Sequence, residues 1–270
     1  MKARSKGTAH LTTVRGSIYD FPHYYDILFG AEWRAEMRFL KACFRKFADR
    51  KVKRVFEPAC GTGRLLVKLA EAGFTVSGND LNPRAVAYCN AALTRAGTRS
   101  RVTLGDMSDF KVERKYDAAF NLISTVRELP SDAKLKDHLR CMARALNPGG
   151  IYLLGLHLTP EKGKPFASEV WKAARGNVKI FSKLWTEFID RKGRSEEIGV
   201  MFSIRTPTKR MRILDTMHYR TYTATQMKRI LGGMKSFELL ETFDFNCDIK
   251  SPIEIDARTQ DAIYVLRKVR

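Results

Sequence analysis

Apolar residues follow two different spacings along this chain, and the change from one to the other marks the expected elements. A short apolar run at 52–56 leads into a turn at 57–63 that contains two glycines. Apolar residues then recur at helical spacing from Leu65 to Ala70, which is the pattern of an amphipathic helix. This order predicts the first strand, turn and helix of an α/β unit.

The alternation of short strands and helices continues to residue 158. Further strands are expected at 74–80, 101–106, 116–124 and 145–157. Residues 1–17 resemble a polar tail, and residues 17–51 are expected to be helical, with aromatic side chains at helical spacing. The pattern therefore predicts an α/β core over residues 52–158, preceded by a tail and a helical segment over residues 1–51.

Residues 159–222 break this alternation. A short helix is expected around Val170 and Trp171, followed by strands at 181–190, 197–205 and 211–222. Ligands of open α/β sheets bind beyond the carboxyl ends of the strands, and we expect this antiparallel insertion to cover that edge. Residues 223–270 return to the core, with a helix at 225–232 and two strands at 237–245 and 262–269.

The glycine turn indicates what kind of ligand it suits. Gly61 and Gly63 lack a Cβ, so the backbone can turn sharply and approach a ligand closely. Leu66 stands where a dinucleotide-binding turn has its third glycine, and Arg64 stands where a phosphate-binding loop has lysine. Glu57 at the strand end would repel a pyrophosphate and suits a ligand with an ammonium group. The turn is therefore expected to bind a nucleoside without a phosphate.

The turn and the acids that follow it resemble a known family. Glu-Pro-Ala-Cys-Gly-Thr-Gly at 57–63 resembles motif I of the class I S-adenosylmethionine-dependent methyltransferases, with Ala59 replacing the first glycine. This exchange of one small residue for another is expected to leave the turn intact. Asp80 lies 17 residues after Gly63, close to the spacing of about 20 typical of a ribose-binding carboxylate. A Gly-Asp pair ends the third strand at Asp106, and Pro-Gly-Gly precedes the fifth strand.

The resemblance implies a cofactor, its site and a fold. The cofactor would be S-adenosyl-L-methionine and the product S-adenosyl-L-homocysteine. Glu57 would bind the methionyl ammonium, Asp80 the ribose hydroxyls and Asp106 the adenine amine, and the other implied cofactor-binding residues are Ala59, Gly61, Gly63, Leu81, Met107 and Leu122. The implied fold is a Rossmann-like, doubly wound, seven-stranded, mostly parallel sheet with an antiparallel last strand and an antiparallel β insertion covering the active site.

The resemblance is to the small-molecule, glycine N-methyltransferase-like branch, which implies in-line transfer of a methyl group to an oxygen or nitrogen atom. The Asn/Asp-Pro-Pro-aromatic motif of RNA amine methyltransferases is absent from residues 121–124, as is the nucleophilic cysteine of cytosine enzymes. A general base is needed only for an unactivated hydroxyl or a protonated amine. Candidate bases are His157, His218 and His23, and Tyr24 or Tyr25 of an N-terminal lid would close over the cofactor.

The composition indicates the size of the core and the cellular compartment expected for the protein. The 270 residues are 44% hydrophobic, which suffices for a large core, but no apolar run approaches the length of a membrane span. The five cysteines are dispersed and include no Cys-x-x-Cys pair. This pattern predicts reduced thiols in the cytoplasm, with no structural metal and no membrane partner.

The net charge of +20, from 49 Lys and Arg against 29 Asp and Glu, leaves alternatives open. Such an excess occurs in nucleic-acid-binding proteins, but here the basic residues are spread along the chain without a basic-aromatic module. A small-molecule acceptor is therefore favoured. The alternatives are an RNA methyltransferase, which only the charge favours, and a non-catalytic scaffold with a cofactor fold. The acceptor's identity and the oligomeric state do not follow from the sequence.

Overall fold

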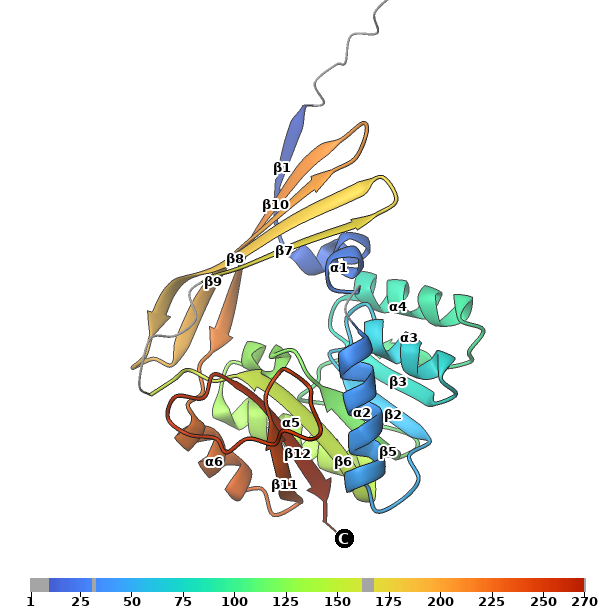
Figure 1. Ribbon diagram of the computed structural model, residues 1–270, viewed down its shortest axis with the longest axis vertical. Coiled ribbons are helices and arrows are strands. Elements are labelled where there is room, and N and C mark those ends of the chain that lie inside the picture. The colour runs from blue at the N-terminus through green and yellow to red at the C-terminus, as the bar shows by residue number, and fades with distance from the viewer. Residues whose placement is uncertain (1–9, 31–32, 162–167, 270) are drawn as a thin grey trace, which may run out of the picture.

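The computed structural model describes residues 10–30, 33–161 and 168–269, and these residues form two β-sheets (Figure 1). The larger sheet has seven strands in the order β11-β12-β6-β5-β2-β3-β4. The smaller sheet has five strands in the order β1-β10-β9-β8-β7. The molecule is therefore built as a seven-stranded core with a second sheet placed across one end of it.

The core sheet is mostly parallel. Its strands are β2 (Arg54–Pro58), β3 (Thr75–Asp80), β4 (Arg101–Leu104), β5 (Tyr116–Asn121), β6 (Leu146–His157), β11 (Phe237–Phe243) and β12 (Asp261–Lys268). Strands β2 to β6 pair in parallel, whereas β12 runs antiparallel to both of its neighbours, β6 and β11. The Rossmann-like α/β class that the sequence predicts is confirmed.

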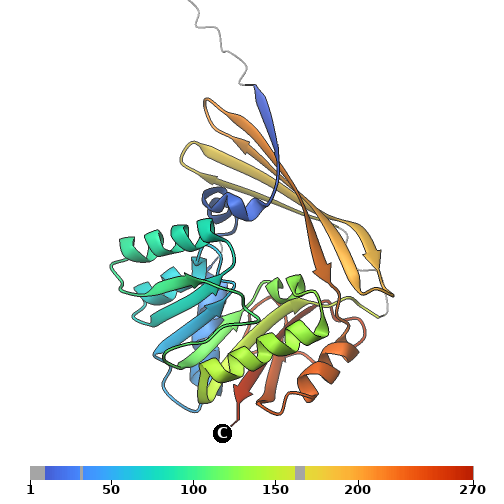
Figure 2. The ribbon, with the colours of Figure 1, turned by 180° about the vertical axis from the view of Figure 1, so that it is seen from behind.

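Helices cover both faces of this sheet. Helices α2 (Arg34–Phe47), α3 (Arg64–Glu71) and α4 (Pro83–Arg95) lie on one face, and α5 (Asp132–Ala145) and α6 (Ala224–Gly232) lie on the other (Figures 1 and 2). Side chains of successive residues in β6 point to opposite faces of the sheet. Tyr152 and Leu154 pack toward α5 and α6, whereas Ile151 and Leu153 pack toward α2 and α3. Two apolar layers thereby bury the sheet on both sides.

Helix starts in the core follow ordinary capping chemistry. The side chain of Asn82 accepts hydrogen bonds from the backbone N–H groups of Arg84 and Ala85 at the start of α4. Thr223 and Gln226 form a reciprocal capping box at the start of α6. Such caps satisfy N–H groups that the first turn of a helix leaves unpaired, and they fix where each loop at the sheet edge ends.

The second sheet combines the insertion with the N-terminal segment. Its strands are β1 (Leu11–Arg15), β7 (Ser168–Arg175), β8 (Val178–Asp190), β9 (Ser195–Arg205) and β10 (Arg210–Arg220). The short helix η1 (Ile18–Asp20) and helix α1 (Pro22–Phe29) pack against it through a third buried cluster that includes Ile18, Ile27 and Phe202. The N-terminal segment is thus held between the second sheet and the core.

Two expectations for these segments are wrong. Residues 11–15 are not a tail, because they pair in parallel with β10 and extend the second sheet. Residues around Val170 and Trp171 are not helical but form β7, where Trp171 packs edge-on against Phe29 and Val170 is exposed. In both places pairing with a neighbouring strand decides the conformation, which a local pattern does not reveal. Residues 1–9 of the expected tail lie outside the described residues.

The second sheet lies over the carboxyl ends of the parallel strands. Strand β12, which is antiparallel, leads to the C-terminus at the far end of the core from the second sheet (Figure 1). The parallel strands therefore end toward the second sheet. Asp132 of the core helix α5 accepts hydrogen bonds from Arg194 and Arg220 at 2.7 and 2.9 Å, and these contacts join the two layers. Within the second layer, Asp215 of β10 accepts a hydrogen bond from the Ile18 N–H of η1 at 2.9 Å.

Gly63, at the start of α3, gives a test of this packing. Gly63 and Gly97 both have a φ of +71°, but an alanine Cβ at Gly63 would collide with the Cys89 Sγ, whereas at Gly97 it would meet nothing within 4 Å. Gly97→Ala should cost about 1 kcal/mol of unfolding free energy for its left-handed backbone, and Gly63→Ala about 1–3 kcal/mol more for the collision. Urea unfolding measures both, and equal losses would contradict the packing described for Gly63.

Candidate active site

The turn between β2 and α3 opens toward the edge that the second sheet covers. Ala59, Gly61 and Gly63 have positive φ values of 49°, 53° and 71°. The turn is therefore intact with alanine at the first glycine position, although a left-handed alanine costs roughly 1–2 kcal/mol. A Cβ built at Gly61 would have no heavy atom within 4 Å, so the backbone there faces open space that a ligand can approach.

Asp80 connects this turn to the end of β3. Its carboxylate accepts hydrogen bonds from the Gly61 N–H at 2.7 Å and from the Asn82 N–H at 2.8 Å. Burial raises the pKa of Asp80, and these two N–H groups act in the opposite direction. A carboxylate has about four acceptor positions, so Asp80 can still accept from ligand hydroxyls. Leu81 beside it is 68% exposed and offers an apolar surface at the same edge.

Glu57 has a feature that calls for a ligand. Its Oε2 is buried without a hydrogen-bond partner among the described residues. Burial raises the pKa of Glu57 well above its ordinary value, and the nearby Arg64 guanidinium acts to lower it. Arg64 is itself held by a two-point ion pair with Glu36 of α2. A buried carboxylate oxygen without a partner is costly, and a ligand ammonium group would satisfy it.

The remaining predicted cofactor residues lie near the ends of β4 and β5. The Asp106 Oδ1 accepts hydrogen bonds from the Ser108 N–H at 2.7 Å and from its hydroxyl at 2.9 Å. Met107 is buried in the apolar layer toward α5, and Leu122 in the layer toward α2 and α3. The fold therefore brings Glu57, the glycine turn, Asp80 and Asp106 to one edge of the core.

The three histidines that the sequence suggests occupy different places. His157, at the end of β6, contacts the Asp261 Oδ1 through its Nδ1 at 2.6 Å, and its ring packs on Phe245. His218 lies on the outer face of β10, with 71% of its side chain exposed, whereas Met217 and Tyr219 face inward, so the structure does not bring it to the edge where the acids meet. His23 is exposed and packs against the Tyr24 ring.

Tyr25, not Tyr24, lies toward the glycine turn. The ring of Tyr24 packs against Phe21 and His23. Burial raises the pKa of Tyr25 to about 12, and its hydroxyl is close enough to Arg64, Glu128, Asp80 and Glu57 for their charges to act on it. Consecutive residues of a helix point about 100° apart, so the two rings have different neighbours, although both pack against the same buried cluster.

A cluster of three tyrosines and one acid faces this edge, and the sequence did not predict three of its members. The Tyr19 hydroxyl donates to the Glu128 Oε1 at 2.9 Å, and the Tyr19 and Tyr25 rings lie 5.6 Å apart. Tyr219 of β10 lies beside Tyr19 and Glu128, with the Arg127 guanidinium 4.9 Å from its ring centre. We call Tyr19, Tyr25, Tyr219 and Glu128 the tyrosine–glutamate cluster.

Glu128 is the titratable acid of this cluster. The residue as a whole is exposed to solvent, but partial burial of its carboxyl group raises its pKa, the hydrogen bond from Tyr19 opposes that shift, and the charges of Asp80 and Asp215 add to it. It belongs to the short helix η2 (Thr125–Glu128), which follows β5 directly. The four members come from η1, α1, η2 and β10, so only the folded chain brings them together, and no spacing in the sequence could have shown them.

Other kinds of site are not supported in the described part of the chain. Residues 10–30, 33–161 and 168–269 contain no group of three or more His, Cys, Asp or Glu side chains placed to hold a metal ion. Among the same residues no helix has the length and apolar character needed to cross a membrane.

Comparison with known proteins agrees with this geometry. Residues 55–150 match the family described as methyltransferase domain. The chain is a class I S-adenosylmethionine-dependent methyltransferase. The methyltransferase is 24% identical over 213 residues to the dTDP-3-amino-3,6-dideoxy-alpha-D-glucopyranose N,N-dimethyltransferase of Streptomyces fradiae, and the match covers 78% of this chain and 79% of the relative.

Solved structures show the same fold as this methyltransferase. An S-adenosylmethionine-dependent methyltransferase from Clostridium acetobutylicum ATCC 824 superimposes with a TM-score of 0.74 at 17% identity, over 93% of this chain and 98% of that one. The sugar N-methyltransferase KedS8 of Streptoalloteichus sp. ATCC 53650 gives a TM-score of 0.72 at 19% identity, over 100% of this chain and 99% of that one. At these identities the likeness establishes the fold of the methyltransferase.

The unpartnered oxygen of Glu57 predicts a pH dependence of cofactor affinity. The raised pKa means that Glu57 takes up a proton as the pH falls, and a protonated carboxyl cannot pair with an ammonium group. Affinity for S-adenosylhomocysteine should therefore fall with decreasing pH, by up to about tenfold per unit below that pKa. Glu57→Gln should bind about 10–100-fold more weakly at neutral pH and lose this dependence.

Calorimetric titration between about pH 5 and 8 measures both effects. Glu71→Gln is the matched control, because Glu71 ends α3 with an exposed side chain that pairs only with Lys68 in the described structure. An unchanged pH dependence in Glu57→Gln would show that Glu57 does not bind the ammonium group.

Proposed function

We propose that this methyltransferase transfers a methyl group to the nitrogen atom of a small-molecule amine. The observation that carries the proposal is the tyrosine–glutamate cluster. It places a carboxyl group with a raised pKa, hydrogen-bonded by Tyr19 at 2.9 Å, beside the edge where Asp80 and Glu57 lie. An acid among tyrosine rings can bind a cationic amine through charge and through the ring faces.

In this proposal the cofactor is held by the residues of the strand ends. Glu57 binds the methionyl ammonium, Asp80 the ribose hydroxyls and Asp106 the adenine amine, with Leu81, Met107 and Leu122 as apolar contacts. The unpartnered Glu57 oxygen and the open backbone at Gly61 support this assignment. When bound, S-adenosylmethionine supplies a methyl group on a sulfonium, which leaves as a neutral thioether.

The protein's part of the reaction is to align the amine and accept its proton. An alkylammonium has no lone pair, so it must lose a proton before nitrogen can attack the methyl carbon. The Glu128 carboxylate accepts that proton, which frees the nitrogen lone pair for attack on the methyl carbon. Alignment of this kind supplies up to about 7–11 kcal/mol of the barrier in favourable cases, and Tyr19, Tyr25 and Tyr219 provide it here.

The charges at this edge favour a small amine over RNA. Glu57, Asp80, Asp106 and Glu128 are all acids, and they would repel a phosphate backbone. The second sheet covers the same edge, and we propose that η1 and α1, which carry Tyr19 and Tyr25, serve as the lid of the site. The amino-sugar substrate in the name of the Streptomyces fradiae relative supports an amine acceptor.

The setting proposed for the enzyme is a reducing compartment such as the cytoplasm. All five cysteines are free, and four of them are buried. Cys60 lies in the glycine turn and Cys89 packs against it from α4. Thiols in these positions are compatible with a reduced interior.

Replacing Glu128 tests its role as proton acceptor. Glu128→Gln should lower the rate of methyl transfer about 100-fold or more, because the amide cannot take the proton from the amine. It should leave affinity for S-adenosylhomocysteine within about twofold, since Glu128 is not assigned to the cofactor. The rate of the unmodified enzyme should rise with pH as Glu128 ionises. The pH–rate profile of the variant should lack this rise.

Glu113→Gln, at an exposed glutamate without a partner in the described structure, is the control and should behave like the unmodified enzyme. An undiminished rate in Glu128→Gln at every pH would remove Glu128 from the reaction.

The choice of acceptor atom is tested with matched acceptors and methyl-labelled S-adenosylmethionine. We expect labelled product from dTDP-3-amino-3,6-dideoxyglucose and none from the sugar in which a hydroxyl replaces the amine, because an alcohol is too weak an acid to lose its proton to a carboxylate. Transfer to the hydroxyl sugar, or to RNA in preference to either sugar, would overturn the proposed acceptor class.

A further inference from the structure

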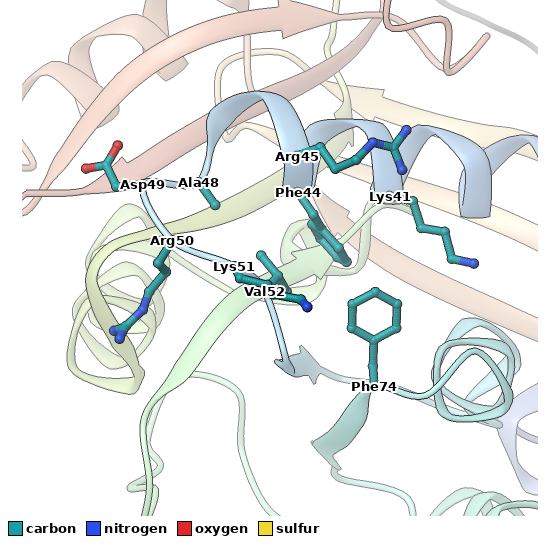
Figure 3. Close-up of a pocket in the computed structure, with 9 residues that line it drawn as sticks. All are labelled: Lys41, Phe44, Arg45, Ala48, Asp49, Arg50, Lys51, Val52 and Phe74. Atoms are coloured by element: carbon teal, nitrogen blue, oxygen red, sulfur yellow. The ribbon is translucent and has the colours of Figure 1, made fainter.

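A concave site lies at the end of the core sheet opposite the methyl-transfer edge. It is a cavity of about 500 Å³ between the second half of α2, the segment 48–52 and Phe74 (Figure 3). Residues 48–52 precede β2 and Phe74 precedes β3, so the cavity lies where the parallel strands begin. The methyl-transfer edge lies where they end, and the two sites are separated by the length of the strands.

Basic side chains surround this cavity with too few acids to pair with them. Lys41 and Arg45 stand one helical turn apart on α2, and Lys51 follows on the next segment (Figure 3). In the described structure none of these three has a carboxylate within ion-pair distance. Arg50 lies 3.4 Å from Asp117 and keeps 49% of its side chain exposed. Asp49, an acid in the lining, is already paired with Arg267 at 3.0 Å.

Aromatic rings form part of the cavity wall. Phe44 and Phe74 meet edge to face with their centres 5.8 Å apart. Phe44 is 4% exposed, whereas Phe74 is only partly buried and offers ring surface to the cavity. Phe74 is the side chain against which a flat heterocycle could stack, since base–aromatic stacking needs an accessible ring.

We propose that this cavity binds a nucleoside polyphosphate, with the phosphates on Lys41, Arg45 and Lys51 and the base against Phe74. Its volume lies within the range of about 300–1,000 Å³ typical of small-ligand sites. Three cations without partners match the charge of a di- or triphosphate. The cations gather around a single cavity and not along a groove, which favours a mononucleotide over a polynucleotide. Lys41, Arg45 and Lys51 also contribute to the net charge of +20. Methyl transfer to a small amine does not require these three cations, whereas phosphate binding would.

Titration of the full-length protein with ATP as the probe tests the proposal, in the presence of saturating S-adenosylhomocysteine to fill the methyl-transfer site. We expect saturable binding, weakened at least about tenfold by Arg45→Glu and by Lys51→Glu, because each exchange replaces an attraction to phosphate with a repulsion. Arg38→Glu makes the same charge change on the exposed face of α2 outside the cavity and should alter the affinity less than about threefold.

Phe74→Leu keeps every charge and removes the ring, and it should weaken ATP binding while leaving binding of inorganic phosphate unchanged. Unaltered affinity for S-adenosylhomocysteine shows that each variant is folded, and none of these readouts depends on the methyl acceptor. The proposal is overturned if ATP does not bind saturably or if ATP and S-adenosylhomocysteine compete. It is also overturned if Arg38→Glu and Arg45→Glu have equal effects, or if a single-stranded oligonucleotide binds to the protein and ATP does not.

Discussion

The contact on which the active site depends is the docking of the second sheet onto the core through Asp132. The Asp132 carboxylate accepts from Arg194, in the turn before β9, and from Arg220 at the end of β10, and the buried pair of Arg127 with Glu196 joins the layers beside it. Burial acts to raise the pKa of Asp132, but the two guanidinium groups outweigh it and lower the pKa. Isolated surface ion pairs contribute little, so it is their combination at one place that fixes Tyr219 above the strand ends.

The two ends of the core differ in electrostatic character. At the covered end, burial raises the pKa of Glu57, Asp80 and Glu128, although the N–H groups of Gly61 and Asn82 act to lower the pKa of Asp80. Such an edge suits ligands that carry a positive charge, among them an ammonium, a sulfonium or an amine. At the opposite end Lys41, Arg45 and Lys51 lie around a cavity, and within the described part of the chain none of them has a carboxylate at ion-pair distance. Net charge therefore describes neither end, and the placement of charge decides which ligand each can hold.

The sequence predicted what local pattern controls and missed what long-range contact controls. Glycine spacing and the acids at strand ends predicted the core and the edge on which Glu57, Asp80 and Asp106 meet. The paired strands β1 and β10 are about 200 residues apart in the chain, so the residues near Leu11 could not indicate that they pair. His218 and Tyr219 are adjacent in β10 and therefore face opposite sides of the sheet. The sequence does not show which of the two faces the core, because a shift of one residue in strand register exchanges their sides.

The most direct test of this account is hydrogen–deuterium exchange with and without S-adenosylhomocysteine. A ligand held at the covered end should slow exchange in the glycine turn at 59–63, at 80–82 and 105–108, and in η1 and α1, which lie under the second sheet. Ligand-dependent protection limited to α2 and residues 48–52, or none in the glycine turn, would contradict the placement of the methyl-transfer site between the two sheets.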